Sequence, residues 1–226
     1  MTEEPCNEDL CATPTIEVDH PSITEFSLRH GSGDEPVARA VALYYAVRDG
    51  IRYDPYTCDL SVAELKASAT LASGRGWCVS KAILLAACCR SLSIPARLGF
   101  ADVRNHLSTA RLRELMQTDV FSWHGYTSLY LLGQWVKATP AFNVELCDKF
   151  RLKPLEFDGT EDSIYHPFDL EGNKHMEYLR FRGEYADTPI AEMAETFARD
   201  YAYLQSDRTL GNFDQEVESE TGCLAD

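Results

Sequence analysis

The stretch of the chain that decides the fold is "ASGRGWCVSKAILLAACCRSLSIPARL", residues 72–98. Between Cys78 and Leu92, small and apolar side chains cover most of the circumference of a predicted helix, which is typical of a buried helix. The glycines of "GRG" allow a sharp turn before the helix, and Pro95 follows its end. The sequence therefore predicts Cys78 in the first turn of a buried helix, where backbone N–H groups lack partners within the helix.

Two further helices are predicted on the N-terminal side of this stretch. Over residues 36–51, Pro36 suits the first helical position and Gly50 suits the position just past the end. Ser61 and Glu64 have the spacing of a capping box, so a second helix is expected to begin there.

Antiparallel strands are predicted on the C-terminal side. Residues 96–103 are expected to form a strand and residues 108–116 a short charged helix. In "WHGYTSLYLLGQWVKATP", residues 123–140, side chains alternate between two faces, and Gly133-Gln134 suits a hairpin turn. One face is predicted to carry His124, Tyr126, Ser128, Tyr130 and Leu132, and the other Gly125, Thr127, Leu129 and Leu131. The remainder is expected to be mostly loop, with a helix near 189–205. Helices followed by antiparallel strands indicate the α+β class.

Charge is distributed unevenly along the 226 residues, whose formal net charge is −15. Residues 1–28 hold seven acidic residues and residues 212–226 hold five, and neither segment holds Lys or Arg. We therefore expect a weakly ordered acidic segment at 1–30, a folded domain over 31–205 and an acidic tail at 206–226.

Composition also excludes several classes of function. No basic stripe is present to neutralise phosphates, so no nucleic-acid partner is expected. No apolar run reaches the ~20 residues of a membrane helix, and the acidic start is unlike a secretory signal. The sequence predicts a cytoplasmic protein with reduced cysteines and with neither a metal nor a cofactor.

Cys78 is the candidate nucleophile among the eight cysteines of the chain. A thiolate is the reactive form of cysteine, and a helix N-terminus or a nearby imidazolium lowers the pKa of a thiol. We expect both effects at Cys78, together with backbone N–H groups that can bind an oxyanion. Cys88 and Cys89, deep in the same helix, are predicted to be structural.

A nucleophilic thiol needs a base, and His124 is the favoured candidate. It begins a regular strand, which can aim a ring nitrogen accurately. His166, in a loop before Pro167, is an alternative that could line a cleft. Trp77, Tyr53 and Tyr56 are further candidates for the wall of such a cleft.

Two blocks of the sequence resemble the transglutaminase-like superfamily. "GRGWCVSKA" is similar to the nucleophile motif at the start of that family's central helix. "WHGYTSLYLLGQWVKATP" is similar to its next block, a histidine on a strand, a hairpin and a tryptophan on the returning strand. The resemblance covers roughly residues 36–145. It implies a papain-like α+β fold with a nucleophile-bearing buried helix packed on an antiparallel sheet.

The resemblance also implies a thioester mechanism. Cys78 would attack an acyl carbon, His124 would carry the proton, and a third polar residue would orient the imidazole. In the family this third position is usually an aspartate, and here it is Thr139, which brings no negative charge. Asn143 is the next candidate and Asp169 the last.

These observations lead to two hypotheses of function. The first is thiol-dependent acyl transfer or hydrolysis at a peptide, amide or thioester substrate, through a Cys78 acyl-enzyme. The second is a catalytically weak or inactive binding module that keeps the fold. The sequence does not distinguish an amine from water as the acyl acceptor, and it does not indicate the oligomeric state.

Overall fold

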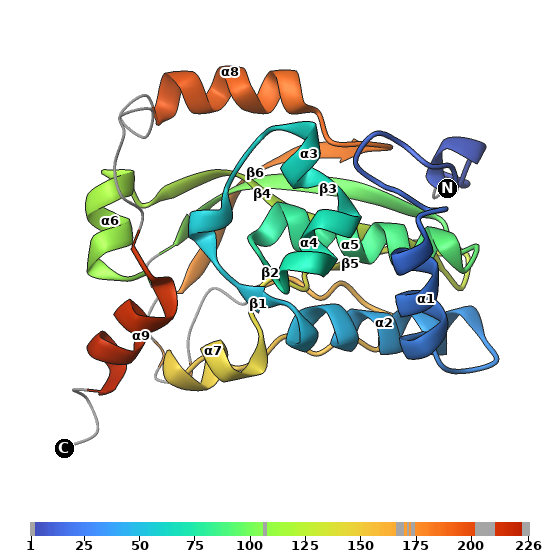
Figure 1. Cartoon of the computed structure of the whole chain (residues 1–226), viewed down its shortest axis with the longest axis horizontal. Helices are drawn as coiled ribbons and strands as arrows, with labels where there is room; N and C mark the ends of the chain where they lie inside the picture. Colours follow the sequence, from blue (N-terminus) through green and yellow to red (C-terminus); the bar gives the residue numbers. More distant parts are fainter. Residues whose placement is uncertain are drawn as a thin grey trace.

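Figure 1 shows a computed structural model in which α5 (Cys78–Ser91) lies at the centre, against a curled antiparallel sheet. The structure describes residues 3–105, 108–165, 170, 172, 175–201 and 211–222. The main sheet has the strand order β5, β4, β3, β6. Its strands are β3 (Ala96–Asn105), β4 (Val120–Leu131), β5 (Gln134–Ala138) and β6 (Met176–Tyr185). The α+β class with a papain-like core, predicted from the sequence, is confirmed.

Short elements and outer helices complete the described part of the chain. β1 (Arg52–Tyr53) pairs in parallel with β2 (Arg75–Gly76). The other helices are α1 (Pro21–His30), α2 (Pro36–Gly50), α3 (Val62–Leu65), α4 (Ala67–Ser73), α6 (Ala110–Met116), α7 (Val144–Lys149), α8 (Ile190–Asp200) and α9 (Phe213–Gly222). Single 3-10 turns lie at Asn7–Asp9 and Pro55–Thr57. In Figure 1, α8 lies above the strands of the main sheet and α2 lies below them.

The predicted boundary signals hold for the principal elements. Pro36 is the first residue of α2, although the helix includes Gly50 instead of ending before it. The Ser61 side chain accepts a hydrogen bond from the Glu64 N–H at 3.4 Å and begins α3. β4 and β5 form the expected hairpin, but its turn is Leu132-Gly133, both with positive φ, one residue earlier than predicted, and Gln134 already belongs to β5.

α5 is buried because it is covered on both sides. β4 and β3 pack against one side, and α1, α2 and α4 pack against the other. A Cβ at Gly125 of β4 would come within 2.9 Å of Val79 Cα, so glycine permits this close approach. The Thr127 hydroxyl donates to the Ala82 carbonyl at 2.9 Å. The predicted alternation of β4 therefore holds here, with Gly125 and Thr127 facing the helix.

A buried lysine connects α5 to its neighbours. Lys81 is fully buried, and its ammonium donates to the carbonyls of Arg48, Ile51 and Ala141 at 2.9, 2.5 and 2.7 Å. These carbonyls lie at the end of α2, just after α2, and after β5. The three donors of an ammonium match three acceptors. Burial lowers the pKa of Lys81 well below its usual value, so these contacts must offset a large desolvation cost.

The N-terminal segment differs from the weakly ordered one predicted. Ile16 and Ile23 are fully buried, the second within α1. Buried Arg90 donates to the Cys11 carbonyl at 2.7 Å, and Arg97 pairs with Asp9 at 2.8 Å. Buried isoleucines and arginines of the folded body therefore hold this segment in place.

The acidic C-terminal segment is also partly folded in the described residues. α9 packs through Phe213, which is buried. Asp214 pairs with Arg52 at 2.9 Å and with Arg75 at 3.1 Å. The predicted domain boundary near residue 205 lies outside the described residues and stays a prediction.

The sequence predicts loop over residues 176–185, whereas the structure has β6 there, an edge strand paired with β3. Leu179 and Phe181 are about half exposed on it, and charged residues alternate with them. Such a pattern is typical of an edge strand but lacks the apolar run by which a buried strand is predicted.

We expect Lys81→Met to lower the free energy of unfolding by about 3 kcal/mol, because it leaves three buried carbonyls without donors. Urea unfolding followed by circular dichroism measures this loss. Lys149→Met removes an exposed ion pair with Glu218 and is the matched control, with an expected loss of about 0–1 kcal/mol. Equal stability of the two variants would show that Lys81 does not secure the helix.

Candidate active site

The turn before α5 places Cys78 at the first helical position. Gly74 ends α4 in a left-handed conformation, with φ of 64°. A Cβ at Gly76 would come within 2.5 Å of Ser80 Oγ, so only glycine fits against the first turn of α5. Trp77 is extended and caps the helix without a side-chain hydrogen bond. The two glycines of "GRG" thus serve different purposes, a left-handed end and a close approach.

The sulfur of Cys78 lies among backbone donors but largely out of water. The side chain is 7% exposed. Burial raises the pKa of the Cys78 thiol to about 11, against the opposing effect of N–H groups of Gly125, Val79 and Cys78 itself. The prediction that the pKa of Cys78 is lowered is therefore wrong. The helix start does favour the thiolate, as expected, but desolvation is the larger effect.

A β-bulge immediately precedes His124. Ala101 pairs with His124 and Val103 with Phe121, so Asp102 faces two residues of β4. One of these, Trp123, has φ of 63°, a left-handed conformation that is strained for a residue with a side chain. Bulges are common next to active sites, where they re-aim a side chain.

Polar and aromatic contacts hold this bulge in place. The Trp123 N–H donates to the Asp102 carboxylate at 3.2 Å, and Arg182 pairs with the same carboxylate at 2.6 Å. The Arg182 guanidinium also lies 4.5 Å from the Trp123 ring centroid. These contacts offset strain on the order of 1–3 kcal/mol.

His124 is buried and neutral. Burial, and then the proximity of His175, lower the pKa of His124 to about 4. Its ring lies 5.9 Å from the ring of Tyr165 and 6.3 Å from that of Tyr178, measured between centroids. Its Nε2 atom is buried and has no hydrogen-bond partner in the described part of the chain.

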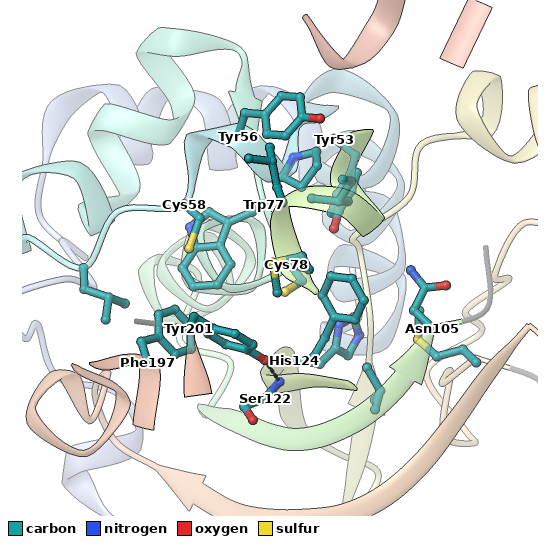
Figure 2. A pocket seen from close by; sticks show the side chains of 18 of the residues that line it. Tyr53, Tyr56, Cys58, Trp77, Cys78, Asn105, Ser122, His124, Phe197 and Tyr201 are labelled. Carbon is teal, nitrogen blue, oxygen red and sulfur yellow. Dashed lines mark hydrogen bonds between the residues drawn. The ribbon is translucent and has the colours of Figure 1, made fainter. Parts of the chain in front are cut away.

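Cys78 and His124 line one cavity of about 430 Å³. Figure 2 shows both side chains on its wall, together with Trp77, Tyr53 and Tyr56. The Gly125 N–H that acts on the sulfur belongs to the residue after His124, so this part of the β4 backbone lies beside the start of α5. This arrangement joins a thiol, an imidazole and backbone donors at an enclosed apolar surface.

A family model described as the transglutaminase-like superfamily matches residues 26–140. The chain belongs to the transglutaminase-like superfamily. The match spans α5 and the β4–β5 hairpin, which are the blocks that carry the resemblance in the sequence. No curated protein matches the chain.

Two solved structures are similar to parts of this superfamily member. A candidate cysteine protease from Cytophaga hutchinsonii aligns at 20% identity and a TM-score of 0.44, over 59% of this chain and 40% of that protein. A candidate protease from Parabacteroides distasonis aligns at 11% identity and a TM-score of 0.38, over 52% of this chain and 23% of that protein. The chain therefore aligns with less than half the length of either solved protein.

Thr139, the first candidate for the third position of the motif, is buried just after β5. Its hydroxyl has no hydrogen-bond partner among the described residues, although it lies near the Tyr178 hydroxyl. The Asn143 side chain accepts from the Tyr53 N–H at 3.1 Å. The side-chain oxygen of Asn143 is thus hydrogen-bonded to β1. Asp169 and His166 lie outside the described residues.

Sequence reasoning missed the part of the cavity wall that α6 and α8 supply. Leu112 and Leu115 come from α6, and Phe197 and Tyr201 come from α8 and its C-terminal end. A signal was present for α8, since Ile190, Met193, Phe197 and Tyr201 follow helical spacing. The packing partner of that apolar stripe could not be predicted from local pattern.

We expect alkylation of Cys78 by iodoacetamide to rise about tenfold per pH unit between pH 7 and pH 10, because the thiolate fraction rises until pH approaches the pKa of about 11. A cysteine in a short unstructured peptide, with a pKa of about 8.5, levels off sooner. Peptide-level mass spectrometry separates Cys78 from the other thiols. A rate that levels off below pH 8 would instead indicate a preformed thiolate–imidazolium pair.

Proposed function

We propose that this chain catalyses thiol-dependent acyl transfer or hydrolysis at an amide or thioester, with Cys78 as nucleophile and His124 as general base and acid. The observation that carries the proposal is the shared cavity, in which backbone N–H groups at the start of α5 and in β4 act on the Cys78 sulfur. A thiol kept only for packing has no need of an imidazole on the same wall.

The protonation states support a general-base route. At neutral pH the high pKa of Cys78 and the low pKa of His124 leave both groups uncharged. His124 takes the thiol proton as sulfur attacks the acyl carbon, and the N–H groups near the sulfur are the donors available to the oxyanion. His124 returns the proton to the leaving amine or thiol, which leaves a thioester on Cys78. An amine or water then attacks the thioester, and its proton passes through His124 back to the sulfur.

We expect 4-nitrophenyl acetate to acetylate Cys78, with release of nitrophenolate. Cys78→Ala should abolish the acetylated peptide, and His124→Ala should slow its formation by about 100-fold or more, since a positioned base contributes at least that factor. Cys88→Ala, a buried thiol on the same helix, is the matched control and should retain acetylation. Equal labelling of wild type and His124→Ala would remove the base from the proposal.

The second candidate function is a binding module with weak or absent catalysis. Two observations favour it, the uncharged Thr139 at the motif's third position and the unpartnered Nε2 of His124 in the described structure. Without a carboxylate, the imidazolium formed during attack gains no ionic stabilisation.

Thr139→Asp tests how much this missing charge costs. A carboxylate near His124 raises the pKa of the imidazole and stabilises its charged form. We therefore expect acetylation of Cys78 to become about tenfold faster, measured by single-turnover nitrophenolate release. Thr139→Asn, of similar size and uncharged, is the control. No acceleration in a folded Thr139→Asp variant would show that Thr139 is not the position that orients the imidazole.

A further inference from the structure

The described residues place no carboxylate, ammonium or guanidinium side chain on the wall of the cavity beside Cys78. Twenty-one described residues line it, and none of them is Asp, Glu, Lys or Arg. Aromatic rings contribute a large part of the wall, as Figure 2 shows around Cys78. They belong to Tyr53, Trp77, Phe121, Phe142, Phe197 and Tyr201. A carboxylate or phosphate on a bound acyl group would lose its hydration here and gain no counter-charge.

Two tyrosine hydroxyls at the wall already have partners within the protein. The Tyr201 hydroxyl accepts from the Ser122 N–H at 2.7 Å and donates to the Val120 carbonyl at 2.9 Å. The Tyr56 hydroxyl donates to Glu216 at 2.6 Å. These groups present their apolar rings to the cavity and direct their polar ends into the protein.

Two charged residues that adjoin lining residues in the sequence are paired. Asp54, which precedes Pro55, pairs with Arg75 at 3.2 Å. Asp200, which precedes Tyr201, pairs with Arg199 at 2.7 Å. No ionic recognition is therefore available to a substrate along the described wall.

We infer that the acyl group transferred to Cys78 is neutral and apolar, either aromatic or a medium-length alkyl chain. This rests on the proposed function, because it concerns the substrate of the same thiol. The cavity volume of about 430 Å³ lies within the range of sites for small ligands and exceeds the need of an acetyl group. The apolar wall then favours longer apolar acyl groups, and the acylation rate rises about fourfold for each methylene that is fully buried.

The test uses the full chain and 4-nitrophenyl esters of acetate, hexanoate, phenylacetate and succinate. Acylation of Cys78 is followed by nitrophenolate release and by peptide mass, and each rate is divided by that of N-acetylcysteine with the same ester. Hexanoyl and phenylacetyl transfer should exceed acetyl transfer by at least about tenfold, and succinyl transfer should be slower than acetyl transfer. Rates for acetyl or succinyl equal to or above those for hexanoyl and phenylacetyl would overturn the inference while leaving Cys78 as a nucleophile.

If the proposed function itself is wrong, none of the esters labels Cys78, which distinguishes that outcome from a failure of this inference.

A pair of variants tests whether the cavity is the source of the selection between acyl groups. Ala194 and Ala191 are both exposed on α8, and only Ala194 lines the cavity. Ala194→Leu should lower the hexanoyl-to-acetyl ratio by at least about threefold, and Ala191→Leu should leave it unchanged. The same ratio in both variants would show that the acyl chain does not enter this cavity.

Discussion

The buried ammonium of Lys81 is the contact on which the arrangement of the site depends. It joins α5, one turn after Cys78, to the end of α2 and to the segment after β5. Each of these pieces would otherwise bury carbonyls without donors, which is costly in an apolar interior. The lysine is therefore both a charge that is expensive to bury and the group that satisfies its surroundings. Its geometry fixes the helix start relative to the strand that returns from the hairpin.

The second constraint is the bulge that precedes His124. A regular β4 would continue its alternation through Trp123, and the left-handed Trp123 breaks it. The strain is held by the Asp102 carboxylate and by Arg182 on β6, a strand that joins the sheet far along the chain. The position of the imidazole is thus determined by three strands together and not by β4 alone.

The site thus depends on both local sequence and contacts with distant segments, and only the local part could be predicted from the sequence. α5, the hairpin and the presence of Cys78 and His124 in one site follow from local periodicity, turn residues and the two motif blocks. The bulge depends on which residues of β3 and β6 lie opposite β4, and a single strand does not encode its partners. The prediction of a lowered pKa for Cys78 is wrong for a related reason. The position of Cys78 at the helix start can be predicted locally, whereas its burial depends on segments that are distant in the sequence. The order of the N-terminal segment also depends on distant groups, since Arg90 and Arg97 order residues near Cys11 and Asp9.

Burial sets the chemical character of the site as a whole. The same exclusion of water raises the pKa of Cys78 and lowers that of His124, so the resting pair is neutral and no ion pair must be held in an apolar cavity. In the proposed reaction, charge would appear during attack, on the imidazole and on the acyl oxygen, where the backbone N–H groups would interact strongly with it at low dielectric. An apolar acyl group would complete this enclosure by displacing water next to the sulfur. Because the resting thiol and imidazole are neutral, the apolar surroundings cost them little free energy before the proposed attack. During that attack, the same low dielectric would strengthen the contacts between the developing charges and the fixed backbone donors.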